Sequence, residues 1–157
     1  MASRIKQLFW LSSALLLMDC AAARVKRANI NTVIETAESY IGTPYRYGGM
    51  SRSGTDCSGL LVNSFAAAGL TLPRSAKGQS KIGKSVSMYE VQPGDLVFFA
   101  CGDSRWKITH VGIVTEVHGK HDVRFVHAST SKGVIEANLW SDYYQDTFRR
   151  ARRPKYR

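Results

Sequence analysis

The order in which helical and strand patterns follow one another limits the folds available to these 157 residues. Apolar residues with helical spacing fill the first half, as in the run over residues 57–68. After a turn signal at Pro93-Gly94-Asp95 the pattern changes to apolar runs typical of buried strands. Helices thus precede strands, without βαβ alternation. This order predicts an α+β domain with N-terminal helices packed on an antiparallel β-sheet.

The individual elements are predicted from periodicity and from the turn residues between them. A first helix is expected over residues 31–41 and a second over residues 57–68, and a glycine follows each. A third, short helix is expected at 75–81. Strands are expected at 96–100, 108–117, 123–128, 134–137 and 147–152, with a hairpin turn at 118–122, a helical turn at 139–144, and loop or irregular strand at 83–89.

The first 23 residues have the features of a secretory signal peptide. A basic start is followed by short apolar runs and small residues, and the apolar run is too short for a transmembrane span. Two processing routes fit: residues 17–20 resemble a lipobox that would lipidate Cys20, and Ala21-Ala22-Ala23 fits ordinary cleavage. An uncleaved anchor is the remaining alternative. We therefore expect an exported, periplasmic domain, lipid-anchored to the outer membrane if Cys20 is modified, with residues 24–30 as a linker.

The net charge of +10 favours an anionic polymer or surface as a partner. Basic residues are concentrated at the C-terminal end, where residues 154–157 are predicted to form a solvated basic tail. No nucleic-acid-binding motif or basic groove interleaved with aromatic residues accompanies these charges, so nucleic acid is not expected as a partner.

Cys57 begins the second predicted helix, directly after a loop rich in glycine and serine at residues 48–54. A thiol in the first turn experiences the partial positive charge of the helix N-terminus, which is expected to lower its pKa. This setting suits a nucleophile; the alternative is a small buried core residue. In an exported protein Cys57 and Cys101 could pair, but no repeated cysteine spacing indicates a disulfide framework or a zinc site.

His110 and His127 each lie within an apolar strand, and the two strands are predicted to be adjacent in one hairpin. Their imidazoles are therefore expected to lie near each other. One can take a thiol proton while the other orients it, which is the nucleophile–base–orienter arrangement. His118 and His121 fall in the predicted turn, where a solvated position is expected.

Four motifs occur in a fixed order: Asp56-Cys57-Ser58-Gly59, then residues 93–99 (PGDLVFF), residues 110–114 (HVGIV) and residues 125–129 (FVHAS). Together they resemble the NlpC/P60 family of cell-wall cysteine peptidases. The resemblance covers roughly residues 34–153, so the catalytic domain is placed at 31–153. Within the family, the chain looks most like the small exported murein endopeptidases of Gram-negative bacteria.

The resemblance implies a circularly permuted papain-like fold and a reaction that needs no metal or cofactor. We expect the protein to act as a monomer. The resemblance also implies the roles of the site residues. Cys57 would be the nucleophile, His110 the general base and His127 the third polar residue. Tyr45 would help the Cys57 N–H to form the oxyanion hole, Asp56 and Ser58 would line the substrate site, and Arg74 would contact a substrate carboxylate.

The implied reaction is hydrolysis of peptidoglycan stem peptides through a Cys57 thioester acyl-enzyme. The expected bond joins the γ-carboxyl of D-glutamate to a diamino acid. Three alternatives stay open: cleavage of the D-alanyl–diamino acid cross-link, an amidase or transpeptidase reaction on the same scaffold, and a non-catalytic wall-binding domain.

Overall fold

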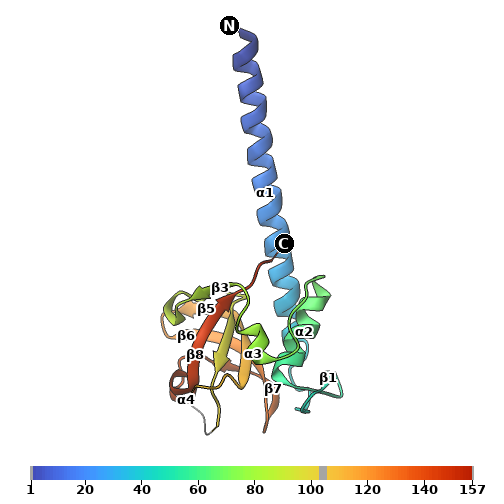
Figure 1. Ribbon diagram of the computed structural model, residues 1–157, viewed down its shortest axis with the longest axis vertical. Helices are drawn as coiled ribbons and strands as arrows, with labels where there is room; N and C mark the ends of the chain where they lie inside the picture. Colours follow the sequence, from blue (N-terminus) through green and yellow to red (C-terminus); the bar gives the residue numbers. More distant parts are fainter. Residues whose placement is uncertain (1, 103–105, 157) are drawn as a thin grey trace.

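The computed structural model describes residues 2–102 and 106–156, with the side chains of residues 2–19 left out. Figure 1 shows a long helix, α1 (Ala2–Glu38), whose N-terminal part projects from a domain of shorter helices and a sheet. Residues 24–30 lie inside this helix, so the prediction of a separate linker is wrong. The physical reason is that residues 2–38 contain neither glycine nor proline to interrupt the helix.

The predicted signal peptide, residues 1–23, lies mostly where side chains are not described, and its cleavage stays a prediction. Within the described part of the chain, no helix has both the length and the apolar character needed to cross a bilayer. Side chains are exposed from Cys20 to Ala28, and α1 packs against the domain core from Ile30 onward.

The α+β order predicted from the sequence is confirmed. One antiparallel sheet has the strand order β3-β8-β4-β5-β6-β7, and a small hairpin pairs β1 with β2. The remaining elements are α2 (Cys57–Ala67), α3 (Ala76–Gln79), α4 (Asp142–Thr147), a 3₁₀ turn (Met88–Glu90), β1 (Met50–Ser51), β2 (Gly54–Thr55), β3 (Lys84–Val86), β4 (Leu96–Phe99), β5 (His110–Gly119), β6 (Asp122–Ser129), β7 (Gly133–Asn138) and β8 (Phe148–Arg153).

The first helix ends at Glu38, three residues before its predicted end. Tyr40 and Ile41 continue only as turns, because each N–H donates to the carbonyl three residues back. Gly42 then adopts a φ of 88° and donates its N–H to the carbonyl of Val134 at 2.9 Å. The positive φ that glycine allows thus turns the chain from α1 onto β7.

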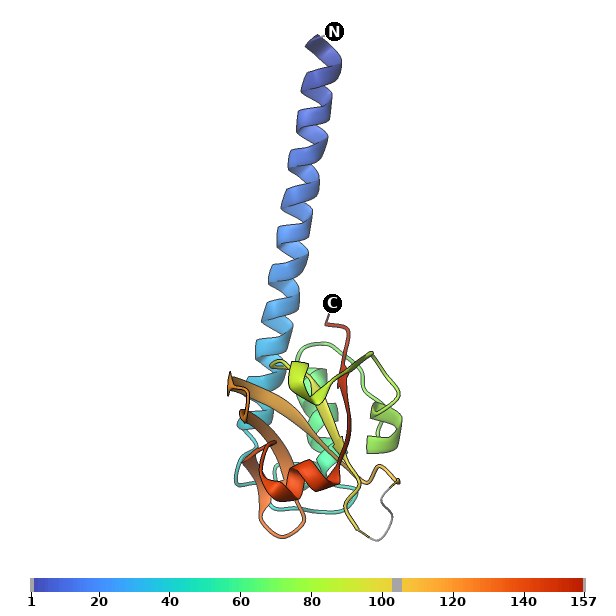
Figure 2. The same cartoon turned by 90° about the vertical axis from the view of Figure 1, so that its left-hand side faces the viewer.

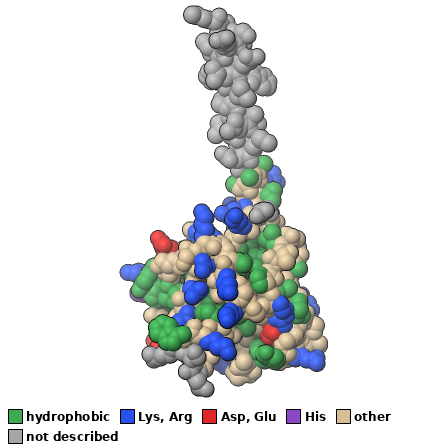
Figure 3. Space-filling view, viewed as in Figure 1, with side chains coloured by type: hydrophobic (Ala, Val, Ile, Leu, Met, Phe, Trp, Pro, Cys, Tyr) green, Lys and Arg blue, Asp and Glu red, His purple; other side chains and the backbone are tan. Residues whose placement is uncertain are grey.

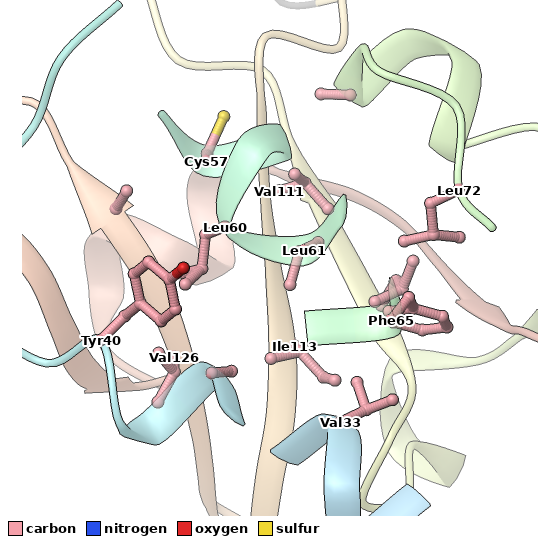
Figure 4. Close-up of a cluster of buried hydrophobic side chains, with 14 of the residues drawn as sticks. Val33, Tyr40, Cys57, Leu60, Leu61, Phe65, Leu72, Val111, Ile113 and Val126 are labelled. Carbon is pink, nitrogen blue, oxygen red and sulfur yellow. The ribbon is translucent and has the colours of Figure 1, made fainter. Parts of the chain in front are cut away.

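The two faces of the sheet carry separate cores. On one face, α1 and α2 pack on β4, β5 and β6; Figure 4 shows Leu61 and Phe65 of α2 near Ile113 of β5 and Val33 of α1. On the other face, Phe99 and Phe125 pack with residues of α4 and β8. Cys57 stands at the edge of the first core, at the start of α2, with its sulfur toward the Val111 end of β5 (Figure 4).

Residues 154–156 do not form the solvated tail that the sequence predicts. Pro154 and Tyr156 are buried, and the Tyr156 hydroxyl donates to the carbonyl of Gly94 at 2.6 Å. Its ring packs on Phe65 with the centroids 5.5 Å apart. The described part of the chain therefore ends beside α1, as the view in Figure 2 also shows, and of the predicted tail Arg157 lies outside the described residues.

Basic side chains cover the face that carries β3 and β8. Figure 3 shows many Lys and Arg side chains there and few acidic ones. Four of these basic side chains are exposed: Lys77 of α3, Lys81 between α3 and β3, Lys84 of β3 and Arg150 of β8. Arg153 is instead ion-paired to buried Asp95 at 2.7 Å, so part of the basic C-terminal charge holds the fold together.

Candidate active site

A groove of about 700 Å³ runs past the start of α2. The loop before α2 lines it with Tyr45 and Tyr47, and the helix start contributes Cys57. Arg74 and the segment before β5, residues 107–109, complete its walls. The groove is open to solvent and can accept an extended peptide.

Asp56 fixes the geometry of the α2 N-terminus. Its carboxylate caps the helix by accepting the Gly59 N–H at 2.6 Å, and it accepts the Gly48 N–H of the preceding loop at 3.0 Å. At Gly59 a side chain would collide with the Gly49 carbonyl, so the helix start and the loop approach this closely only because Gly59 has none. The Asp-Cys-Ser-Gly motif thus positions Cys57 against the loop.

Arg74 joins Asp56 and Ser58 in one polar network. Its two terminal nitrogens donate to the two Asp56 oxygens at 2.9 and 2.6 Å, and one of them also donates to Ser58 Oγ at 2.9 Å. Burial opposes the charge of Asp56, but the Arg74 guanidinium and the Gly59 N–H together hold its pKa below the usual value. The structure brings the three predicted substrate-binding residues together, with Arg74 paired to Asp56.

The Cys57 thiol is buried, with 7% of the residue exposed, and burial raises its pKa to about 11. The Val111, Ser58 and Cys57 N–H groups favour the thiolate, but they do not compensate for the lost hydration, and the Asp56 charge adds to the rise. The sequence-based expectation of a lowered pKa is therefore wrong for the free protein, because desolvation outweighs the helix N-terminus.

Tyr45 lies close enough to the thiol for their charges to interact. Burial raises the pKa of Tyr45, and the charges of Cys57 and Asp56 raise it further. Its backbone bridges to Thr55, immediately before the helix cap. The phenol is thus a neutral hydrogen-bond donor on the wall of the groove.

The two histidines meet as the sequence predicts. Nε2 of His110 lies 2.8 Å from Nδ1 of His127, with the rings at 88° to each other. Pairing of Ile113 with Val126 sets the register of β5 and β6 and puts both imidazoles on the sheet face opposite α2. Burial lowers the pKa of both side chains, so each is neutral near pH 7.

Sequence reasoning missed Tyr144. Its hydroxyl lies 2.8 Å from Nε2 of His127, so it extends the histidine pair by one member. The sequence indicates only a helical turn at 139–144, and a turn does not show which side chain reaches a strand. Only the tertiary packing of α4 on the sheet reveals this contact.

Cys57 and His110 lie at the same strand, β5, whose backbone the thiol contacts at the residue after His110. The Val111 N–H lies at the Cys57 thiol, and Val111 directly follows His110. Among the described residues, no hydrogen bond joins Cys57 to His110. The structure thus brings the thiol to the backbone next to the expected base, and a direct thiol–imidazole contact stays a prediction.

All three cysteines are free thiols. Cys101 lines a cavity of about 100 Å³ together with His110, His127, Tyr143 and Tyr144. Within the described residues, no group of three His, Cys, Asp or Glu side chains is placed to hold a metal ion.

Comparison with known proteins gives matches over most of the chain. A family model described as NlpC/P60 family matches residues 42–153. The probable endopeptidase NlpC of Escherichia coli K12 is 42% identical over 153 residues, which cover 91% of this chain and 96% of that protein. Murein DD-endopeptidase MepS/Murein LD-carboxypeptidase of the same strain is 39% identical over 122 residues, covering 77% of this chain and 61% of that protein.

Matches to longer proteins cover the same domain. Gamma-D-glutamyl-L-lysine dipeptidyl-peptidase of Bacillus subtilis 168 is 37% identical over 95 residues, covering 60% of this chain and 32% of that protein. The crystal structure of an NlpC/P60 family protein from Bacillus cereus superposes with a TM-score of 0.70 at 29% identity, over 79% of this chain and 39% of that one. The chain thus spans nearly all of the first relative and a smaller part of the others.

Proposed function

Since the chain belongs to the NlpC/P60 family, we propose that it cleaves stem peptides of peptidoglycan at the γ-D-glutamyl–diamino acid bond, through a thioester on Cys57. Family membership makes the chain a cysteine peptidase with the papain-like fold of its structural neighbours. The observation that carries the proposal is the placement of Cys57. It lies at a helix N-terminus, in an open groove, against the residue that follows His110.

In the proposed mechanism, His110 takes the thiol proton on Nδ1, because its Nε2 is already bonded to His127. Sγ of Cys57 then attacks the carbonyl carbon of the scissile amide. The Cys57 N–H and the Tyr45 hydroxyl donate to the oxyanion that forms. His110 returns the proton to the leaving amine, and a water that His110 activates hydrolyses the thioester.

Asp56, Ser58 and Arg74 are proposed to line the subsite next to Cys57. Their network is already formed in the free protein, and Arg74 keeps 41% of its side chain exposed. The Arg74 guanidinium can therefore meet a substrate carboxylate while it remains paired with Asp56.

The relatives support both of the bonds considered. The name of the Bacillus subtilis relative specifies a γ-D-glutamyl-L-lysine dipeptidyl-peptidase, and that of MepS specifies a murein DD-endopeptidase. We take the second name as support for the alternative bond, the D-alanyl–diamino acid cross-link. Mass analysis of products from defined muropeptides distinguishes them. A new free γ-D-glutamyl carboxylate supports the proposal, a new D-alanyl carboxylate supports cross-link cleavage, and a new cross-link indicates transfer.

The substrate is proposed to be met in the periplasm, by a domain exported through its N-terminal leader and processed before Cys20, which would then carry the lipid anchor. The leader pattern and the exposed position of Cys20 support this. Labelling with a radioactive fatty acid tests it: the native chain should take up label and Cys20→Ala should not.

The first prediction concerns the nucleophile. Cys57→Ala should abolish release of soluble peptides from purified sacculi, because it removes the thiol that forms the proposed acyl-enzyme. Cys101→Ala, at a thiol outside the groove, should retain the activity. Undiminished digestion by folded Cys57→Ala would refute the proposed function.

A further inference from the structure

Tyr144 extends the hydrogen-bonded pair of His110 and His127, and its own contact with His127 has no part in the proposed mechanism. Its Oη lies 2.8 Å from Nε2 of His127, and Nδ1 of His127 lies 2.8 Å from Nε2 of His110. Tyr144 comes from α4, whereas the histidines come from the β5–β6 hairpin. A separate element thus supplies the third member of the chain.

Packing fixes the rings of Tyr144 and His127. Tyr144 contacts Phe99 and Phe125 at centroid distances of 5.3 and 4.8 Å. His127 is 2% exposed and stacks on Phe125 at 5.0 Å. Burial raises the pKa of Tyr144 to about 12, so its hydroxyl is neutral and can donate or accept. With the rings held, only the protons along the chain are free to change place.

These protons have two arrangements. In the first, Tyr144 donates to Nε2 of His127, which donates from Nδ1 to Nε2 of His110. His110 then carries its proton on Nδ1 and cannot accept one there. In the second, His110 donates from Nε2 to His127, and His127 donates from Nε2 to Tyr144. Only the second arrangement leaves Nδ1 of His110 free to act as a base.

We propose that Tyr144 is a positioning residue whose hydroxyl oxygen accepts the Nε2–H of His127 and so selects the working tautomer of the histidine pair. The proposal rests on the proposed function in taking His110 as the base. After His110 has accepted the Cys57 proton, both its nitrogens carry hydrogen, so His127 must accept on Nδ1 and keep its own proton on Nε2. This buried N–H needs an acceptor, and the Tyr144 oxygen is in place.

The proton balance leaves Tyr144 unchanged through the cycle. One proton moves from Sγ of Cys57 to Nδ1 of His110 and then to the leaving amine. Tyr144 keeps its own proton and only accepts a hydrogen bond, which strengthens while His110 is an imidazolium. Its contribution is therefore expected in the chemical step and not in substrate binding.

Tyr144→Phe tests the proposal, because it keeps the ring between Phe99 and Phe125 and removes only the hydroxyl. On a defined muropeptide, kcat should fall about tenfold with KM unchanged, which corresponds to about 1.4 kcal/mol. The acid limb of kcat/KM should move to lower pH, because the variant no longer stabilises the imidazolium. Besides His127, the titratable groups that act on Tyr144 are Tyr143 of α4 and Cys101 after β4, and Arg149 of β8 acts on Cys101.

Tyr143→Phe is the matched control. It removes a hydroxyl from the neighbouring residue of the same helix, where that group bonds to Cys101 and not to His127. Its kcat and pH profile should equal those of the native chain. Thermal unfolding of both variants shows whether the fold is intact.

A readout independent of catalysis is the ¹⁵N spectrum of the histidine side chains. The native protein should carry the proton of His127 on Nε2, and Tyr144→Phe should increase the form protonated on Nδ1. A native His127 protonated on Nδ1, or a variant with unaltered tautomers and kcat, would overturn the proposal and leave the Cys57 test unaffected. Altered tautomers in a protein that does not digest sacculi would support the role of Tyr144 and contradict the proposed function.

Discussion

At Cys57, the burial that packs the thiol against β5 and the N–H groups that favour a thiolate act in opposite directions. Burial is the larger effect, and it raises the pKa to about 11. A thiolate at neutral pH therefore requires a group that takes the proton and stays beside the sulfur as a cation. We expect His110 to be that group, because the Val111 N–H at the thiol belongs to the next residue.

This dependence is testable by alkylation. His110→Ala should slow the reaction of Cys57 with iodoacetamide at pH 7–8 at least about tenfold, because the thiolate fraction then follows the raised pKa of an isolated buried thiol. The rate should be measured across pH 6–11, with Cys57 identified by peptide mass.

His118→Ala is the control for that experiment. His118 lies at the exposed end of β5, where it contacts Glu116, and its loss should leave the alkylation profile unchanged. Equal profiles for the native chain and His110→Ala would show that His110 does not accept the thiol proton.

At the scale of elements, the start of α2 is held by one carboxylate. Asp56 caps the helix through the Gly59 N–H, holds the loop through Gly48 and pairs with Arg74. The position of the nucleophile thus depends on a capping residue as well as on the helix. A change at Asp56 should therefore affect stability and activity together.

Asp56→Ala should lower the free energy of unfolding by about 1–2 kcal/mol, as measured by denaturant titration, because it removes the cap and leaves Arg74 without its partner. Asp56→Asn keeps a capping oxygen, so its free energy of unfolding should fall by less than that of Asp56→Ala. Equal stability of the native chain and Asp56→Ala would contradict the capping role.

The stability difference between the native chain and Asp56→Asn should depend on pH, and the direction follows from the pKa of Asp56. The pKa of Asp56 is lowered by folding, so its stabilisation is present above its unfolded-state value of about 4 and is lost as the pH falls through the folded-state pKa. The stability difference between the native chain and Asp56→Asn should therefore shrink in acid.

The elements themselves were largely predictable, because local pattern determines them. The apolar run at 96–100 and the alternation at 108–128 appear as β4, β5 and β6. The extent of α1 was not predictable from the sequence, since a basic segment such as residues 24–30 suits a linker and a helix equally. Of the site, the meeting of His110 with His127 followed from hairpin register. The Asp56–Arg74 pair and Tyr144 depend on contacts between distant segments, which no local pattern encodes.

For the molecule as a whole, the C-terminal residues fasten separate parts of the fold. Tyr156 packs on Phe65 of α2 and bonds to Gly94 in the turn before β4. At Gly94, with a φ of 92°, a side chain would come within 3.1 Å of both Ile30 of α1 and the Tyr156 hydroxyl. The end of the chain thus ties α1 and α2 to the sheet.

Tyr156→Ala should lower the free energy of unfolding by about 3 kcal/mol, because it empties a buried aromatic site. Tyr156→Phe keeps the ring and should lose only about 1 kcal/mol with the hydrogen bond to Gly94. Denaturant titration measures both. If the last residues were a solvated tail, both variants would match the native chain, and that outcome would contradict the structure.

The helical course of α1 has a consequence for where the enzyme can cut. If Cys20 carries a lipid, the exposed helical residues between it and Ile30 become a stiff spacer. At about 1.5 Å of rise per residue this spacer measures roughly 15 Å. A flexible linker would let the groove sample a range of depths in the wall, whereas a stiff one holds it at one height above the bilayer. The layer of peptidoglycan within reach would then be set by the number of helical turns after Cys20.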